Sequence, residues 1–285
     1  MRKELKDSLV TKAKKSGLEI SEQEYVNDPE ENLLKTITNW TEISAELSKG
    51  QGSELRERKG NNPSKFCSIF SSSALCVNNF ALIKQNTSKI TFRDYGCFDS
   101  VIFEGKVHTG ISSPNLDVLM ENEKYLCGVE SKFTEYLSNK KINYKVNGKP
   151  TLTNYKDRIN EISITKKNKL ESILNYYIEK DKRNKKSHLD VAQLIKHSIG
   201  LINQAKKKGK TPVLIYIYWE PQNKGEIKTI CDKHMQEIDE FSKTVNGFIE
   251  FKAISYPDYW NEFKKYAFLK TNIAENENRY LIPIL

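Results

Sequence analysis

Two stretches with the apolar patterning of β-strands, 115–120 and 125–133, are separated by only four residues. A connection this short makes the two strands antiparallel neighbours, because a parallel return needs a crossover of about a dozen residues or more. Similar stretches at 88–95 and 100–107 precede them with short spacers. The sequence therefore predicts an antiparallel meander, and this meander constrains the fold more than any other feature.

Helical patterns flank the predicted meander. The apolar residues between 66 and 80 predict a buried helix before it, and 189–206 predict an amphipathic helix after it. The apolar run 212–219 then predicts a central strand, followed by a helix at 228–245 and a strand at 248–255. This order of helix, antiparallel strands, helix and strand indicates an α/β fold with a mixed sheet.

Changes in composition divide the chain into three parts. Residues 1–50 are expected to be helical, with capping-box spacing between Ser21 and Glu24. Residues 51–255 hold the predicted core, and 256–285 form a C-terminal extension.

A segment rich in lysine and asparagine, 138–187, is predicted to be an insertion into this core. Within it, Asn147-Gly148 is a strong signal for a two-residue hairpin, 167–180 predict a helix, and 181–187 resemble a charged linker. Lysines neutralise phosphates and aromatic side chains stack on bases, so the insertion is a candidate for contact with nucleic acid. A solvated loop and a dimerisation element are the alternatives.

The chain has 285 residues and a net charge of +9, carried mostly by lysine. Such a surplus suits a polyanionic partner, although a lysine-rich soluble surface explains it equally well. The longest apolar run, 213–219, is far too short for a membrane span, and the first 15 residues lack a signal-peptide core. Five cysteines without a C-x-x-C pair indicate reduced thiols. We therefore expect a cytoplasmic protein with no membrane partner.

The residues that can carry chemistry lie on the two paired strands. If Met120 faces Tyr125 across a four-residue loop, strand parity places Asp117 on the same face as Glu130 and Lys132. The diagonal from Asp117 to Glu130 would then be about 7–8 Å, which a metal ion held by both carboxylates can bridge. A register slip of one residue would place the two acids on opposite faces.

Two carboxylates and an ammonium group have a joint use in phosphodiester hydrolysis. Carboxylates hold Mg²⁺, which neutralises phosphate charge and turns water into a usable nucleophile. A neighbouring ammonium stabilises the negative charge that develops.

The same spacing of glutamate and lysine also occurs where surface salt bridging is the simpler explanation. One competitor combines Asp94 with Glu104 and Lys106, but a loop at 96–99 would place Asp94 and Glu104 on opposite faces. Further E-x-K sequences begin at Glu4, Glu57, Glu226, Glu250 and Glu262.

Asp117 with Glu130-Ser131-Lys132 resembles the PD-(D/E)XK nuclease motif of the restriction-endonuclease-like superfamily. Pro114 departs from the motif, since it stands three residues before Asp117 and not next to it. The resemblance to a bacterial restriction-endonuclease-like family covers roughly 50–220. Its further phrases are Gly52-Ser53-Glu54-Leu55, Ser71-Ser72-Ser73-Ala74-Leu75, Pro114-Asn115-Leu116-Asp117, Glu130-Ser131-Lys132-Phe133-Thr134-Glu135 and Ala192-Gln193-Leu194-Ile195-Lys196-His197.

The resemblance implies a restriction-endonuclease-like core of helix, three-stranded meander, helix and strand. It implies that Asp117, Glu130 and the backbone carbonyl of Ser131 bind Mg²⁺, for which Mn²⁺ can substitute. Lys132 would be the catalytic lysine.

The resemblance also points to residues outside the two strands. Some superfamily members add an acid from the helix before the sheet, and Glu54 is the best-placed one here. Members often place a polar residue from the following helix at the active site, and Gln193 or Lys196 could fill that role. His197 is expected to be structural.

The activity implied is that of a Mg²⁺-dependent restriction-type endonuclease on double-stranded DNA. The alternatives are a structure-selective repair or recombination nuclease, a less specific defence nuclease, and a DNA-binding protein without turnover. A homodimer would supply the two active sites that cleavage of both strands usually needs.

Overall fold

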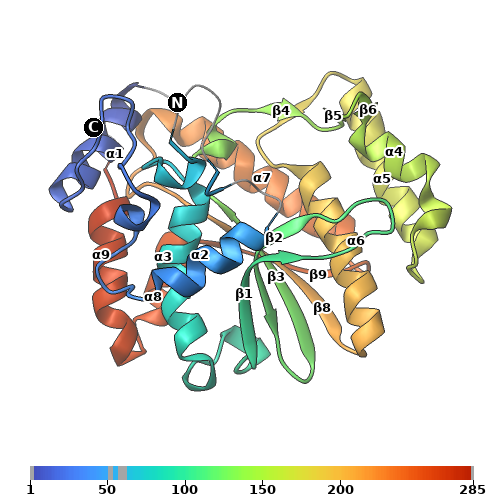
Figure 1. Cartoon of the computed structure of the whole chain (residues 1–285). Helices are drawn as coiled ribbons and strands as arrows, with labels where there is room; N and C mark the ends of the chain where they lie inside the picture. The colour runs from blue at the N-terminus through green and yellow to red at the C-terminus, as the bar shows by residue number, and fades with distance from the viewer. Residues whose placement is uncertain (1–2, 51–53, 57–62, 284–285) are drawn as a thin grey trace.

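The computed structural model describes residues 3–50, 54–56 and 63–283, and within them a mixed five-stranded β-sheet forms the centre (Figure 1). The strands β1, β2 and β3 form the predicted antiparallel meander, and β8 and β9 run parallel to β3. Across the sheet the strands are β1 (Ser100–Lys106), β2 (Asn115–Glu121), β3 (Tyr125–Lys132), β8 (Thr211–Tyr218) and β9 (Glu250–Ser255).

Helices cover both faces of the sheet, which explains the long apolar runs in its inner strands. In β8 the alternate residues Val213 and Ile215 belong to one hydrophobic cluster, and Leu214 and Tyr216 belong to the other. The first cluster includes residues of α3 (Ser72–Gln85), α8 (Tyr256–Phe263) and α9 (Lys270–Tyr280). The second includes residues of α6 (Val191–Lys208) and α7 (Lys228–Val245).

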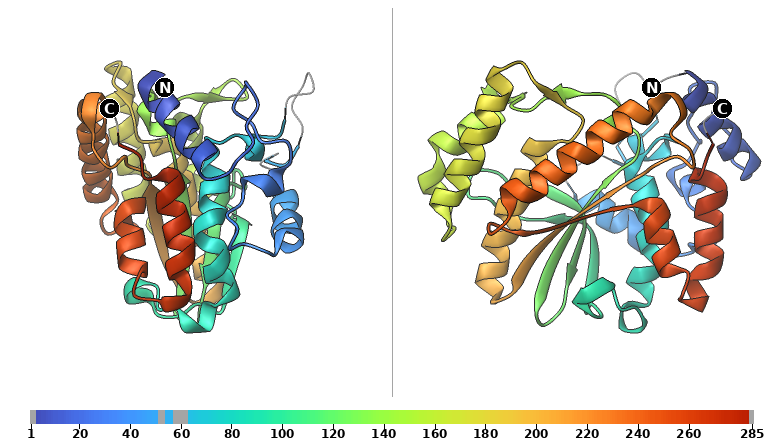
Figure 2. Two further views of the ribbon diagram at one scale, coloured as in Figure 1. Left: turned by 90° about the vertical axis from the view of Figure 1, so that its left-hand side faces the viewer. Right: turned by 180° about the vertical axis from the view of Figure 1, so that it is seen from behind.

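The two ends of the chain pack together beside the sheet. Helix α1 (Lys3–Lys15) lies next to α9, as the side view in Figure 2 shows. Asn78 of α3 donates to Tyr280 Oη at 2.8 Å, which joins α3 to the end of α9. Helix α2 (Trp40–Lys49) covers the edge strand β1, where Glu46 accepts a hydrogen bond from the amide of Phe103 at 2.9 Å.

The lysine-rich insertion forms a projection at the end of the sheet where α6 begins (Figure 1). Its hairpin at Asn147-Gly148 is confirmed, and both turn residues have the positive φ that such a turn requires, 50° and 77°. The predicted linker at 181–187 begins inside α5 and ends in β7. The elements of the insertion are β4 (Lys140–Lys141), β5 (Lys145–Val146), β6 (Lys149–Pro150), α4 (Thr151–Asp157), α5 (Lys167–Lys182) and β7 (Lys186–Ser187).

The prediction of a helical N-terminal segment is wrong between α1 and α2. Ser21 and Glu24 do not cap a helix: Ser21 Oγ accepts from the amide of Tyr25 in a turn, and Glu24 has a φ of 65°. A backbone bridge between Tyr25 and Ser68 holds this segment extended. Contact with a distant part of the chain therefore overrides the local helical signal.

The strand predicted at 88–95 is also wrong, because two short 3₁₀ helices, Thr87–Lys89 and Arg93–Tyr95, occupy this stretch. A side chain from a distant segment, and not a neighbouring strand, makes hydrogen bonds with the backbone here. Tyr266 Oη accepts from the amide of Thr91 and donates to its carbonyl. Apolar residues here enter the core without joining the sheet.

The register between β2 and β3 differs from the prediction by two residues. Met120 faces Cys127 and not Tyr125, because Asn122 pairs with Tyr125 and the turn is tighter than four residues. A shift of two residues preserves strand parity, so the faces assigned to the side chains are unchanged.

In the described part of the chain, no helix has both the length and the apolarity needed to cross a membrane. All five cysteines are free thiols, and Cys97 is exposed while the other four are buried.

Candidate active site

The carboxylate of Asp117 lies at the point where β2 separates from β3. The pairing of these strands extends as far as Val118 and Val129. Beyond it, the backbone amide of Ser131 donates to Asp117 Oδ2 at 2.6 Å. A buried amide needs an acceptor, and here the Asp117 side chain replaces the backbone carbonyl that a continuing ladder would offer. Asp117 therefore meets β3 between Glu130 and Lys132.

The backbone carbonyl of Ser131 points toward the same place. In an extended strand the amide and carbonyl of one residue point to the same side. The neighbouring Lys132 carbonyl accepts from the amide of Trp219 at 2.9 Å on the β8 side, so the Ser131 groups face β2 and Asp117. The Ser131 hydroxyl lies 2.8 Å from Tyr256 Oη of α8.

Glu130 is a buried carboxylate with a cationic neighbour. Its side chain is 3% exposed, and Oε1 accepts a hydrogen bond from Lys132 Nζ. Its other oxygen lies 3.1 Å from His197 Nδ1 of α6, within ion-pair distance but without hydrogen-bond alignment. Burial alone would raise the pKa of Glu130, but Lys132 and His197 outweigh it and lower the pKa to about 2.

Lys132 is held between the sheet and α6. Its ammonium donates to Glu130 and, at 3.0 Å, to Gln193 Oε1 in the first turn of α6. Burial alone would lower the pKa of Lys132, but the surrounding carboxylates, first among them Glu130, raise it well above the usual value. The side chain therefore remains a fixed cation. The structure brings together Asp117, Glu130, Lys132 and Gln193.

Glu104 of β1 adds an acid that sequence reasoning placed only in a competing motif. The neighbouring pairs Phe103–Val118 and Gly105–Leu116 put it opposite Asp117, and its φ is 52°. Burial and then the charge of Glu54 raise the pKa of Glu104 to about 7. Counting register from Asp117 back to 100–107 could have identified it. Asp94, its predicted partner, lies in a 3₁₀ helix and not on a strand.

Glu54 lies in a turn, whereas the resemblance implies an acid from the helix before the sheet. Its neighbours 51–53 and 57–62 lie outside the described residues. The turn is fixed by contact with a later segment, since the amide of Phe66 donates to the Glu54 carbonyl at 3.1 Å. The Glu54 carboxylate lies 3.4 Å from Lys65 Nζ. Its negative charge helps to raise the pKa of Glu104, which lies opposite Asp117.

Negative charge accumulates around Asp117 without an equal number of cations. Burial raises the pKa of the half-buried Asp117 well above its usual value, and Glu130 and Glu104 add to this rise against the opposing charge of Lys132. The mutual repulsion of these acids would be relieved by a bound cation.

The available oxygen donors suit Mg²⁺. The described residues include no group of three His, Cys, Asp or Glu side chains able to hold a metal by themselves. Mg²⁺ does not require one, because it usually keeps several waters and binds to one or two carboxylates together with substrate phosphate. Asp117, Glu130 and the Ser131 carbonyl are the groups that could hold it.

Two other residues predicted on α6 lie close to the site without contributing to the metal donors. His197 is buried beside Glu130, in agreement with the structural role expected for it. Lys196 is partly buried, and burial together with the nearby cations Lys140 and Lys132 lowers its pKa.

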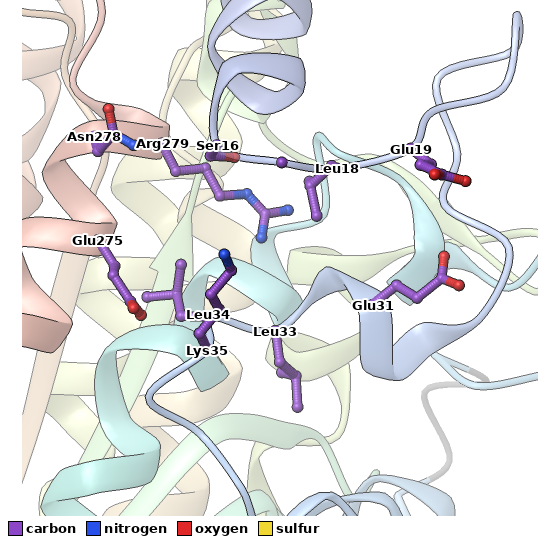
Figure 3. Close-up of a pocket in the computed structure, with 11 residues that line it drawn as sticks. Ser16, Leu18, Glu19, Glu31, Leu33, Leu34, Lys35, Glu275, Asn278 and Arg279 are labelled. Carbon is purple, nitrogen blue, oxygen red and sulfur yellow. The ribbon is translucent and has the colours of Figure 1, made fainter.

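A cavity of about 490 Å³ lies between the N-terminal segment and α9, and none of the site residues lines it. Figure 3 shows Arg279 extending from α9 into this region, near Leu18 and Lys35. Its guanidinium donates to the backbone and side-chain oxygens of Asn32. Arg279 thus joins the two ends of the chain.

Comparison with known families identifies a family that this chain matches. The family described as "Restriction Endonuclease associating with ARP" matches residues 6–281, nearly the whole chain. A search of curated proteins gave no match, and a search of solved structures gave none. The match confirms the resemblance to a restriction-endonuclease-like family predicted from the sequence motifs.

Proposed function

Because the chain belongs to the family described as "Restriction Endonuclease associating with ARP", we propose that it is a Mg²⁺-dependent endonuclease of double-stranded DNA. In this proposal its core is that of the restriction-endonuclease-like fold, with α3, the meander β1 to β3, α6 and β8 as the shared elements.

The observation that carries the proposal is the contact of Asp117 with the backbone of β3 between Glu130 and Lys132. It brings a second carboxylate, a backbone carbonyl and an ammonium group to one point of the sheet. Oxygen donors for a hard cation and a cation for phosphate are the groups that phosphodiester hydrolysis uses.

Asp117, Glu130 and the Ser131 carbonyl would hold the metal. When bound, Mg²⁺ neutralises phosphate charge and lowers the pKa of a coordinated water. The excess of carboxylates around Asp117 makes this end of the site attractive to a cation and unattractive to phosphate alone. Substrate and metal should therefore bind cooperatively.

Lys132 would stabilise the negative charge that develops on the phosphate. Its ammonium is already oriented by Glu130 and by Gln193, so little reorganisation is needed when substrate arrives. Since its surroundings keep it protonated, we assign it the role of a cation and not of a general base.

Double-stranded DNA is the substrate that best fits the charge of the chain, +9, and the lysine-rich insertion beside the site. A homodimer would provide one site for each strand. The family description also names ARP as an associate, so association with ARP is part of the proposal.

Incubation with supercoiled plasmid and Mg²⁺ tests the proposal. We expect cleavage that EDTA abolishes and that Asp117→Asn lowers by roughly 10²–10³-fold. Glu123→Gln, in the exposed turn of the same hairpin, is the matched control and should cleave normally.

Absence of metal-dependent cleavage on duplex, single-stranded and branched DNA would refute the proposal and favour a binding protein. Discrete fragments would indicate a restriction-type enzyme, whereas a smear would indicate a less specific nuclease. Preference for branched DNA would indicate a structure-selective one.

A further inference from the structure

The insertion contributes a side chain to the support of the active site. We propose that Lys140, from the insertion, and Asp190, at the start of α6, form a positioning pair that holds Gln193 against Lys132. This inference rests on the proposed nuclease function, and it gives the insertion a role in catalysis that is separate from binding the substrate.

Asp190 is the centre of the arrangement. It is only 8% exposed, and both of its carboxylate oxygens accept hydrogen bonds. Oδ1 accepts from the amide of Gln193 at 3.1 Å, which caps the N-terminus of α6. Oδ2 accepts from Lys140 Nζ at 2.5 Å. The insertion and the first turn of α6 therefore meet on one carboxylate.

The arrangement continues to the catalytic lysine. Gln193 makes two hydrogen bonds in this arrangement. Its backbone amide donates to Asp190, and its side-chain oxygen accepts from Lys132 Nζ at 3.0 Å. Movement of the first turn of α6 would move Gln193 and change the direction in which Lys132 points. A displacement of about 1 Å in such a support can reduce a rate by as much as 100-fold.

The backbone of Lys140 is held in place from the opposite side. Strand β4 pairs with β7, where Lys140 faces Ser187. Ser187 Oγ and the amide of His188 both donate to Glu237 of α7, at 3.0 and 2.7 Å. The base of the insertion is therefore anchored to a core helix.

The burial of Asp190 distinguishes this pair from an ordinary surface ion pair. Exposed ion pairs contribute little to stability, whereas removal of the cationic partner of a buried carboxylate leaves its negative charge buried and uncompensated. The Lys140 side chain is 43% exposed, so its substitution leaves no cavity in the core and should not prevent folding.

Steady-state cleavage of a DNA duplex with Mg²⁺, measured over a series of duplex concentrations, tests the inference. We expect Lys140→Met and Asp190→Asn each to lower kcat about 10-fold with KM changed less than twofold. Asn still caps the helix, so Asp190→Asn removes the charge and keeps the cap. The double variant should be no slower than either single variant, because the two residues act as one unit.

Two further variants serve as controls. Lys140→Arg should restore at least half of the activity, and Lys141→Met, the exposed neighbour on the same strand, should leave kcat unchanged. An unchanged kcat in Lys140→Met, or an effect confined to KM, would overturn the inference. A pure KM effect would mean that Lys140 binds a substrate phosphate.

A second measurement does not depend on activity. In the metal-free protein, Lys140→Met should accelerate hydrogen exchange at the Gln193 amide about fivefold, and Lys141→Met should not. Equal exchange in both variants would overturn the positioning role. If the wild-type chain cleaves no DNA, the proposed function fails, while the exchange measurement still shows whether the pair holds Gln193.

Discussion

The sheet contains the same short sequence, a glutamate and a lysine two residues apart, on its central strand and on an edge strand. Glu130 and Lys132 of β3 are 3% and 14% exposed and hydrogen-bonded to each other. Glu250 and Lys252 of β9 are 40% and 46% exposed and 3.9 Å apart. Identical spacing therefore produces a buried cluster in one strand and a partly exposed ion pair in the other.

The neighbours of each strand account for the difference. Strand β3 lies between β2 and β8, so Asp117 and the side chains of α6 surround its pair. Among the strands that the structure describes, β9 ends the sheet and pairs with β8 alone. Water weakens the interaction at the edge, whereas burial strengthens every charge interaction at the centre. An E-x-K sequence becomes a buried cluster of coupled charges only where other strands and helices enclose it.

The largest expected difference is in catalysis. Lys132→Met should lower plasmid cleavage by roughly 10²–10³-fold, because it removes the cation assigned to the phosphate. Lys252→Met should cleave at the wild-type rate. Equal rates for the two variants would contradict the contrast between the strands, and circular dichroism should confirm that both variants fold.

The next difference is in stability. Glu130→Gln should lower the free energy of unfolding by about 3 kcal/mol, because it leaves Lys132 buried without its carboxylate. Glu250→Gln should change it by no more than about 0.5 kcal/mol. Urea unfolding at pH 7 measures both values, and similar values would refute the contrast.

The loss in Glu130→Gln should depend on pH. Lys132 and His197, acting against burial, lower the pKa of Glu130 from 4.5 in the unfolded chain to about 2. As pH falls below 4.5, the unfolded chain therefore binds a proton before the folded one. The stability that Glu130 provides is present above pH 4.5 and declines toward pH 2. The difference in free energy of unfolding between wild type and Glu130→Gln should therefore narrow between pH 4.5 and pH 2. A constant difference would show that the charge of Glu130 is not its cause.

A smaller effect is expected from metal binding. Mg²⁺ at ten times its dissociation constant should stabilise the folded protein by about 1.4 kcal/mol, seen as a rise in Tm. Glu250→Gln should retain this rise and Asp117→Asn should lose it. A rise that survives in Asp117→Asn would place the ion elsewhere.

The smallest effect is a gain in stability. Without metal, Asp117→Asn should raise the free energy of unfolding by about 1 kcal/mol, since the amide oxygen can still accept from Ser131 while the repelled charge is gone. The raised pKa of Asp117 has the same origin, burial and then the charge of Glu130. Thermal unfolding in EDTA measures the gain, and a fall in Tm would show that the charge stabilises the fold.

Local patterns predicted the elements whose hydrogen bonds stay between neighbours in sequence. The meander after residue 100 agrees with its prediction, and the helix at 228–245 has the predicted ends. The turn at Asn147-Gly148 was equally predictable, because its backbone requires residues that tolerate positive φ. The strand predicted at 88–95 does not form, because the distant Tyr266 supplies hydrogen bonds to the backbone of Thr91.

The candidate site also combines features that the sequence predicted with features that depend on tertiary packing. Strand parity alone placed Asp117 on the face of Glu130, because side chains alternate whatever the length of the turn. Three other features depend on which strands and helices become neighbours. They are the register between β2 and β3, the position of Glu104 beside Asp117, and the hydrogen bond from Lys132 to Gln193. Alternation is a property of one strand and can be counted along the chain. Burial and charge coupling belong to several segments at once, so only their packing together decided which glutamates of the E-x-K sequences, Glu104 and Glu130, lie in the acidic cluster.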